Sequence, residues 1–275
     1  DSLEAVTARL VGFSIAITPG EAAYVPLDHS SDDMFGERPA QIPMGDALAL
    51  LGPVLADDSV LKIGQNLKYD IAVLAQHGLS ITPFDDTMLM SFALDAGRQG
   101  HGMDELARTI LNHECVTFKS LTGTGKKAIG FDQVPLKDAT RYAAEDADVT
   151  LRLWHHLKLR LAAEGVSRIY EMVERPLPPV VAGMECAGIK VDREKLARLS
   201  HEFAEAIVAL EGEIHGLAGQ PFTIGSPKQL GDILFDKLGL KGGRKGKSGQ
   251  FSTDQAVLEK LSEQGAPIAD KILEW

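Results

Sequence analysis

Tyr142 and Asp146 stand four residues apart, a spacing that places a hydroxyl and a carboxylate on one face of a helix. They belong to Arg141–Asp148 (RYAAEDAD), which we expect to open a long amphipathic helix. The apolar positions of this helix recur at Val149, Leu153, Leu157 and Leu161. The same spacing carried backwards puts Asp146 and Tyr142 on or beside the buried face. Because an unpaired buried carboxylate is unfavourable, Asp146 should find a cation, a set of donors or a metal. The alternative is an aspartate at a helix start that stabilises the helix dipole.

A second carboxylate, Asp70, follows a predicted strand. Val60–Ile63 is a short apolar stretch, Asn66 stands where a helix N-cap belongs, and Leu67–Gly78 has helical spacing of its apolar residues. Asn66 and Asp70 would then lie one turn apart, at the strand-to-helix edge where α/β sheets place their ligands. The sequence therefore predicts two helix-borne carboxylates, one of which follows a strand.

These two groups of residues resemble a known family. The pairing of Asn66-x-x-Tyr69-Asp70 with Tyr142-x-x-x-Asp146 is similar to the second and third exonuclease motifs of the DEDD nucleases, in the branch with a tyrosine in the third motif. Three longer stretches resemble the Klenow-type proofreading domain of the bacterial DNA polymerase I family (family A): GQNLKYD (64–70), FDDTMLMSFAL (84–94) and RYAAEDADVTL (141–151). The resemblance runs from Asp1 to Trp275 and is more specific than either short motif.

The resemblance implies a two-metal 3′-5′ exonuclease. Two divalent ions about 3.5–4 Å apart activate a water and stabilise the leaving 3′ oxygen, and hard oxygen ligands suit Mg²⁺ or Mn²⁺. By resemblance, Asp146 would ligate the metal that carries the attacking water, Asp70 would support the second metal, and Tyr142 would orient the water.

The resemblance also implies contacts with the single-stranded 3′ end of DNA. Asn66 and Tyr69 are similar to groups that position the metal ligands or the strand. Leu3 and Phe118 are similar to apolar contacts to the terminal bases. Stacking on such side chains tolerates any base, which a proofreading enzyme requires.

One motif of the family is not found in the sequence. The family's first motif is an Asp-x-Glu pair on the opening strand, and it lies just before the residues that correspond to Asp1–Leu3. Asp1 and Glu4 do not replace it, because their separation puts them on opposite faces of a strand. We therefore expect this chain to hold half of the metal ligands, to bind at most one divalent ion weakly and to have weak or no activity. Its parent would be a DNA polymerase with exonuclease activity. We also expect two unpaired sheet edges where the strand is missing.

Residues 1–165 are predicted to form an α/β domain. Strands at 10–17 and 22–27, joined by a Pro-Gly turn, indicate an antiparallel hairpin. Helices are expected at 44–55, 87–94 and 103–111. The resemblance implies the ribonuclease-H-like fold of DEDD exonucleases, with a mixed sheet whose first strand is missing.

Residues 166–275 are predicted to be all helix, with long helices at 192–217 and 227–238. The concentrated basic charge lies in the glycine-rich stretch 241–249, at Lys241, Arg244, Lys245 and Lys247. Such a loop could follow a phosphate backbone, and a solvated mobile loop is the open alternative. The resemblance implies an incomplete polymerase thumb that grips duplex DNA, and no polymerase palm in this chain.

Composition indicates an ordinary soluble globular chain, and the start at Asp1 and not at Met leads us to expect a segment of a longer protein. The 275 residues are 44% hydrophobic, without an apolar run that would span a membrane. Cys115 and Cys186 lie far apart without metal-type spacing, which suits reduced core thiols in a cytoplasmic protein. Nothing in the sequence indicates more than a monomer. A net charge of −11 argues against a generic nucleic-acid coat, but a metal-dependent phosphodiesterase tolerates it.

Two other functions stay open. The nuclease motifs alone would also fit an RNA-directed DEDD exonuclease, although the polymerase-like residues from Glu174 onward would then be unexplained. The second is a non-catalytic DNA-binding scaffold that keeps the fold. Retention of Asp70, Tyr142 and Asp146 favours an active parent enzyme.

Overall fold

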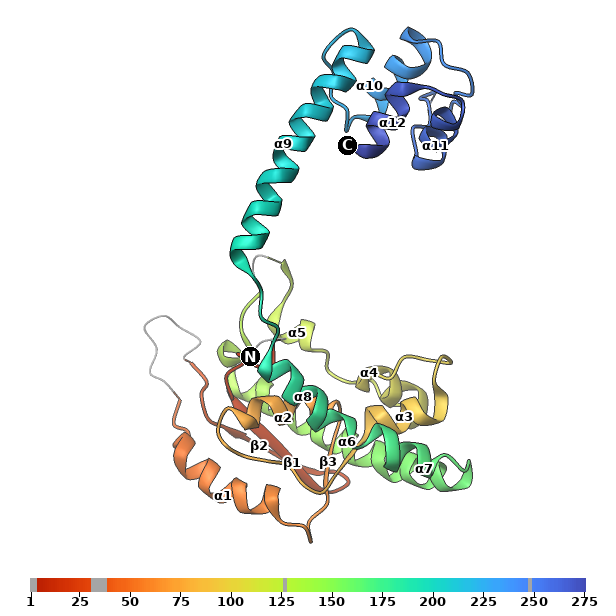
Figure 1. Cartoon of the computed structure of the whole chain (residues 1–275). Coiled ribbons are helices and arrows are strands. Elements are labelled where there is room, and N and C mark those ends of the chain that lie inside the picture. The colour runs from red at the N-terminus through yellow and green to blue at the C-terminus, as the bar shows by residue number, and fades with distance from the viewer. Residues whose placement is uncertain (1–3, 31–38, 126–127, 247–248) are drawn as a thin grey trace. The chain divides into compact units, whose positions relative to one another are not determined.

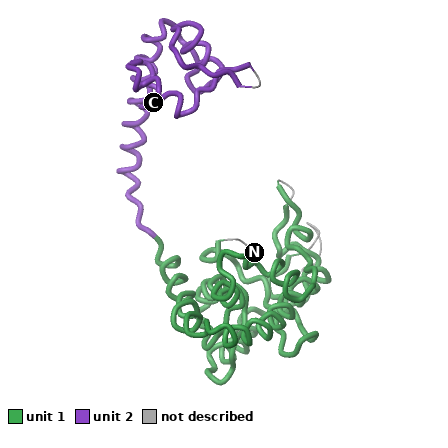
Figure 2. The backbone as a smooth tube through the Cα atoms, turned by 90° about the vertical axis from the view of Figure 1, so that its right-hand side faces the viewer, with its two compact units in different colours: residues 1–188 green, residues 189–275 purple. Residues whose placement is uncertain are grey.

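The computed structural model describes residues 4–30, 39–125, 128–246 and 249–275. The chain divides into two compact units, residues 1–188 and 189–275, which are shown in different colours in Figure 2. The sequence placed the division between its two functional parts earlier, at 165/166. The residues between these positions include helix α8 (Leu177–Ala187), which packs on helix α2 (Leu67–Ala75) of the first unit.

The described strands of the first unit form two separate pairs. Strands β1 (Gly12–Thr18) and β2 (Glu21–Pro26) make the predicted antiparallel hairpin, in which Thr18 pairs with Glu21 across the turn. Strands β3 (Lys62–Gly64) and β4 (Phe84–Asp86) pair in parallel. The α/β class is therefore confirmed. Among the described residues no backbone hydrogen bonds join the two pairs, so the mixed sheet with a missing first strand that the resemblance implies stays a prediction.

Helix α6 (Leu136–Ala163) organises the first unit and contacts strands of both pairs (Figure 1). Its predicted apolar positions are all buried: Val149, Leu153, Leu157 and Leu161. The helix begins at Leu136 and not near Arg141, so Asp146 lies inside the helix. The alternative that Asp146 stabilises the start of a helix is therefore wrong.

Shorter helices complete the first unit. They include single turns of π-helix, written η1 and η4, and a 3-10 turn, η3. Their bounds are α1 Met44–Ala56, α3 Thr87–Asp95, α4 Met103–Leu106, η1 Ala107–Leu111, α5 Phe118–Thr122, η3 Phe131–Gln133, α7 Ser167–Ile169 and η4 Tyr170–Glu174. One hydrophobic core lies between α3, α4, η1, α6 and η4.

A buried aspartate fixes β4 against α6 and η4. Asp85 is fully buried and accepts hydrogen bonds from Trp154 Nε1 at 2.8 Å, Lys158 Nζ at 3.0 Å and Tyr170 Oη at 3.0 Å. Arg175 lies 3.4 Å away from the same carboxylate. Because its charge is paired and its oxygens are satisfied, Asp85 has a structural explanation and is not a candidate metal ligand.

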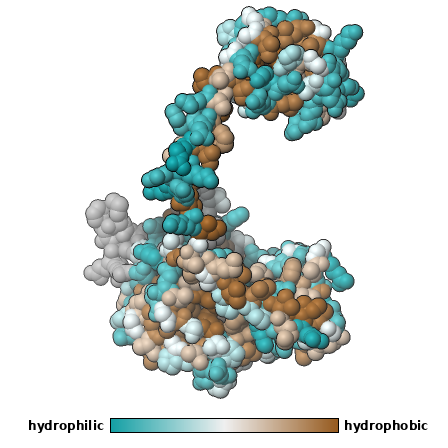
Figure 3. All heavy atoms as spheres, in the orientation of Figure 1, coloured by the Kyte–Doolittle hydropathy of each residue, from teal (hydrophilic) through white to brown (hydrophobic). Residues whose placement is uncertain are grey.

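The described residues of the second unit form helices, as predicted, and an isolated β-bridge between Lys245 and Phe251. Its elements are α9 Arg193–Ala218, α10 Pro227–Gly231, the π-helical turn η5 Asp232–Lys237, α11 Gln255–Glu263 and α12 Pro267–Glu274. Ile214, Leu234 and Ala269 lie at the centre of its core. Figure 3 shows hydrophobic and hydrophilic side chains side by side along α9, where Leu196 and Phe203 are exposed.

No helix among the described residues is long and apolar enough to cross a membrane. Cys115 is partly buried, whereas Cys186 is exposed. The expectation that both cysteines are small core residues is therefore wrong for Cys186, which lies on the solvent side of α8.

Candidate metal and nucleic-acid site

The helix that carries Asp70 is held at its N-terminus by a residue from a different segment. Asn66 does not cap α2 through its side chain, and its backbone is left-handed, with φ 58°. Asp86, which caps α3, instead accepts hydrogen bonds from the backbone amides of Asn66 at 3.1 Å and Leu67 at 2.8 Å. Asn66 therefore occupies the N-cap position of α2, as predicted, but its side chain does not cap the helix, because the Asp86 carboxylate already accepts the amides of Asn66 and Leu67.

Asp70 lies in the first turn of α2 and is exposed. Desolvation by nearby protein groups raises the pKa of Asp70 to about 7, with a further contribution from the negative charge of Asp86. The carboxylates of Asp70 and Asp86 repel each other unless a cation is present, and that of Asp70 is accessible to such a cation. This makes Asp70 a reasonable ligand for a divalent ion.

Asp146 and Tyr142 lie one turn apart on α6, as the four-residue spacing predicts. Asp146 Oδ1 is buried and has no hydrogen-bond partner in the described structure. Burial raises the pKa of Asp146 to about 7 against the opposing effect of a hydrogen bond with Tyr142, and Asp104 and Glu145 raise it further. Because an orphaned carboxylate oxygen among other acidic groups is unfavourable, Asp146 fits a hard divalent cation, Mg²⁺ or Mn²⁺.

An aromatic cluster lies beside Tyr142. The ring of Phe118 stacks on that of Phe131 with centroids 6.0 Å apart, and both rings contact Tyr142 edge-on, at 6.2 and 5.7 Å. The rings of Tyr24 and His29 also contact Phe131 edge-on. Phe118 is 46% exposed, so this cluster presents an aromatic face to solvent. The same ring contacts Tyr142, which lies one helical turn from Asp146.

The predicted residues fall into two groups in the structure. Tyr142, Asp146 and Phe118 lie together around α6, and Asn66, Tyr69 and Asp70 lie on or beside α2. The charges that act on Asp70 and Asp146 come from different residues, so a joint site made by the two carboxylates stays a prediction. Leu3 lies outside the described residues.

The basic stretch of the second unit is anchored at its base. Lys241, Arg244 and Lys245 are exposed, and the Lys245 ammonium lies 4.4 Å from the ring centroid of Phe251. The backbone amide of Ser252 donates to the carbonyl of Arg244 at 2.8 Å. Lys247 lies outside the described residues. The described cations therefore lie on or beside the strand segment that bridges to Phe251, a residue that packs on the core.

Sequence reasoning missed Phe131 and the role of Asp86 as a cap for α2. Phe131 lies in a short 3-10 turn without periodicity, so no sequence pattern separates it from a core residue. The two aspartates before a helix in FDDT do indicate a cap, but only for the helix that follows them.

The chain matches two protein families. A family model described as 3′-5′ exonuclease matches residues 1–162, and the model of DNA polymerase family A matches residues 193–275. Among curated proteins, the DNA polymerase I of Rhizobium leguminosarum is 53% identical, over 100% of this chain and 28% of its own length. The DNA polymerase I of Pseudomonas aeruginosa is 44% identical, over 100% of this chain and 30% of its own length. The chain therefore spans less than a third of these relatives.

A solved structure shares the fold. The POL domain of Pol1 from M. smegmatis, in complex with DNA primer-template and dNTP, superposes with a TM-score of 0.68 at 24% sequence identity, over 98% of this chain and 44% of that chain. At this identity the likeness concerns the fold alone.

Proposed function

Because the chain belongs to the bacterial DNA polymerase I family (family A), and contains that family's 3′-5′ exonuclease region and the start of its polymerase region, we propose that residues 1–165 remove nucleotides from DNA 3′ ends. The observation that carries this proposal is the buried, unpartnered Oδ1 of Asp146 beside Tyr142 and the aromatic cluster. The reaction would be metal-dependent hydrolysis of the terminal phosphodiester.

Each residue of the proposed site has a distinct part in this proposal. Divalent ions, when bound, activate water and stabilise the leaving oxygen. Asp146 offers a buried carboxylate oxygen to such an ion, and the exposed residue Asp70 offers a second carboxylate. The Tyr142 hydroxyl, already close enough to interact with Asp146, can orient the attacking water. Phe118 and Phe131 stack on the terminal bases, which holds the 3′ end without selecting a sequence.

The second part of the chain, residues 166–275, is proposed to grip duplex DNA as the beginning of a thumb. Its support is the family A match and the exposed cations of the basic stretch, which can neutralise phosphates. We further propose that the protein acts as a monomer in the cytoplasm, and that its first part has the ribonuclease-H-like fold of DEDD exonucleases.

The proposal is tested with a 5′-labelled single-stranded DNA and Mn²⁺. The assay uses this chain and a version extended upstream by about ten residues, enough for the Asp-x-Glu strand expected from the resemblance. We expect stepwise shortening from the 3′ end by the extended version. Asp146→Ala should reduce the rate at least about a hundred-fold, since even outer groups at a metal site contribute ten- to a hundred-fold.

Asp148→Asn is the matched control on the same helix. Asp148 binds the backbone amide of Gly20 at 2.5 Å and lies 3.5 Å from Arg152, so it is engaged in structural contacts and should be dispensable for hydrolysis. Equal cleavage of an RNA oligonucleotide would instead favour the RNA-directed alternative. If the extended version binds DNA but does not cleave it, the non-catalytic scaffold is the function that remains.

A further inference from the structure

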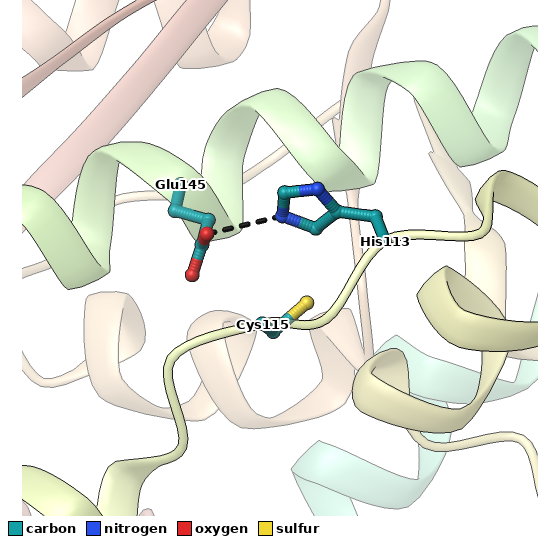
Figure 4. Close-up of side chains that lie close together, drawn as sticks. All are labelled: His113, Cys115 and Glu145. Carbon is teal, nitrogen blue, oxygen red and sulfur yellow. Dashed lines mark hydrogen bonds and ion pairs between the residues drawn. The ribbon is translucent and has the colours of Figure 1, made fainter.

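Three side chains that the proposed exonuclease does not use lie together beside α6. His113 and Cys115 belong to the segment between η1 and α5, and Glu145 belongs to α6. His113 Nε2 lies 3.0 Å from Glu145 Oε1, and one ligand atom from each of the three residues lies within 4.8 Å of the others. Figure 4 shows the imidazole directed at the carboxylate, with the Cys115 thiol in the same space.

The second carboxylate oxygen of Glu145 is held from the opposite side. Glu145 Oε2 accepts a hydrogen bond from the backbone amide of Val116 at 2.7 Å. This bond fixes the orientation of the carboxylate and leaves Oε1 directed towards His113. Ligating carboxylates in metal sites are commonly oriented by such outer hydrogen bonds. The segment before α5 and helix α6, which supply the three ligands, are thus already joined by hydrogen bonds.

The donor set is nitrogen, sulfur and oxygen, which suits a borderline-soft transition metal ion and not Mg²⁺. Zn²⁺ binds thiolate at about 2.3 Å and imidazole nitrogen or carboxylate oxygen at about 2.0–2.2 Å, so its tetrahedral ligands lie roughly 3.3–3.6 Å apart. The present ligand atoms, all within 4.8 Å of one another, need an inward movement of about an ångström or less. Side-chain rotation in the non-helical segment before α5 can supply this movement.

We propose that His113, Cys115 and Glu145 form a three-ligand binding site for Zn²⁺, with a fourth position open to water. The site is separate in chemistry from Asp70 and Asp146, which offer only hard oxygen ligands. Phe118 lies three residues after Cys115, and Glu145 adjoins Asp146. Zinc binding would therefore fix the segment that presents Phe118 against the helix that carries Tyr142 and Asp146.

Cobalt substitution tests the proposal without depending on nuclease activity. The EDTA-treated full chain is titrated with Co²⁺, and absorption is recorded in the near ultraviolet, where a thiolate ligand gives an intense charge-transfer band. We expect a band that saturates at one Co²⁺ per chain and is bleached by Zn²⁺. Cys186→Ser should keep the band, and Cys115→Ser should lose it. Glu145→Gln should weaken Co²⁺ binding at least about ten-fold.

Alkylation of the two thiols gives an independent measurement in the unmodified protein. Zn²⁺ should slow the reaction of Cys115 with iodoacetamide at least about ten-fold, because a coordinated thiolate is a poorer nucleophile. Cys186, which is exposed and lies outside the site, should react at the same rate with and without Zn²⁺. Mg²⁺ should protect neither thiol. A cobalt band that survives in Cys115→Ser, no band in the unmodified chain, or Cys115 alkylation indifferent to Zn²⁺ would overturn the proposal.

Discussion

The carboxylate of Asp86 accepts the backbone amide of Leu67, the first residue of α2, at 2.8 Å, although 19 positions separate the two residues. The same carboxylate accepts the amides of Met88 at 2.9 Å and Leu89 at 3.4 Å at the start of its own helix α3. One buried side chain therefore caps two helices, and one of these carries Asp70.

Asp86→Ala should destabilise the first unit more than the loss of an ordinary cap. We expect the free energy of unfolding to fall by about 2–4 kcal/mol, because a single cap is worth about 1 kcal/mol and the buried or partly buried amides of two helices would lose their acceptor. Urea denaturation followed by circular dichroism measures the change. Asp254→Ala, which removes the exposed cap of α11, is the control and should cost about 1 kcal/mol. Equal losses in the two variants would contradict the double-cap role.

The aromatic cluster predicts a measurable contribution to DNA binding. Phe118→Ala should weaken binding of a short single-stranded DNA by about 1–3 kcal/mol, the range for loss of one stacked base, and Phe118→Trp should retain it. Fluorescence anisotropy in EDTA separates this effect from hydrolysis. Phe92 is similarly exposed, at 44%, but packs on His101, so Phe92→Ala is the matched control. An unchanged affinity in Phe118→Ala would show that the ring does not contact the DNA.

The sequence was sufficient for features set by local periodicity. The four-residue spacing identified the buried face of α6, and the turn residues identified the hairpin of β1 and β2. The start of α6 was placed too late, because the residues before Arg141 lack a strong apolar pattern. Asn66 looked like a cap by residue type alone, whereas its amide partner is supplied by Asp86 from 20 positions away.

Features made by tertiary contacts were not predictable from one sequence. The cysteines had no metal-type spacing, and Cys115 meets its neighbour Glu145 only because the segment before α5 folds against α6. Likewise, Phe131 is recognised as part of the candidate site only because its ring contacts those of Phe118 and Tyr142. Such partners are far apart along the chain, and only packing shows which of many aromatic or acidic residues meet.

The ion pair of Asp95 and Arg160 predicts a pH-dependent contribution to stability. The guanidinium binds both carboxylate oxygens, at 2.9 and 3.4 Å, and these hydrogen bonds hold the pKa of Asp95 below its ordinary value of 3.8. Asp95→Asn should therefore lower the free energy of unfolding by about 1–3 kcal/mol at pH 7.

The sign of this dependence follows from the lowered pKa. Stability from ionised Asp95 is fully present above pH 3.8 and is lost as the pH falls through the lower folded-state pKa. The difference between wild type and Asp95→Asn should thus be constant from pH 7 to about 5 and shrink below 3.8, measured by urea denaturation. Glu164→Gln removes a more exposed partner of Arg160 and should change stability by less than about 0.5 kcal/mol. A constant difference down to pH 3 would refute this account.

The basic stretch predicts a change in the salt dependence of duplex binding. If Arg244 neutralises one phosphate, Arg244→Ala should reduce the slope of log affinity against log salt by about 1, because about one condensed cation fewer is released. The loss of affinity should be similar for different DNA sequences, since phosphate contacts carry no base information. Anisotropy titrations of a labelled duplex at several salt concentrations give the slope.

Lys260 is also exposed, on α11, but lies outside the basic stretch, so Lys260→Ala is the control and should leave the slope unchanged. If both variants reduce the slope equally, binding reflects the general charge of the unit and not a grip by the basic stretch.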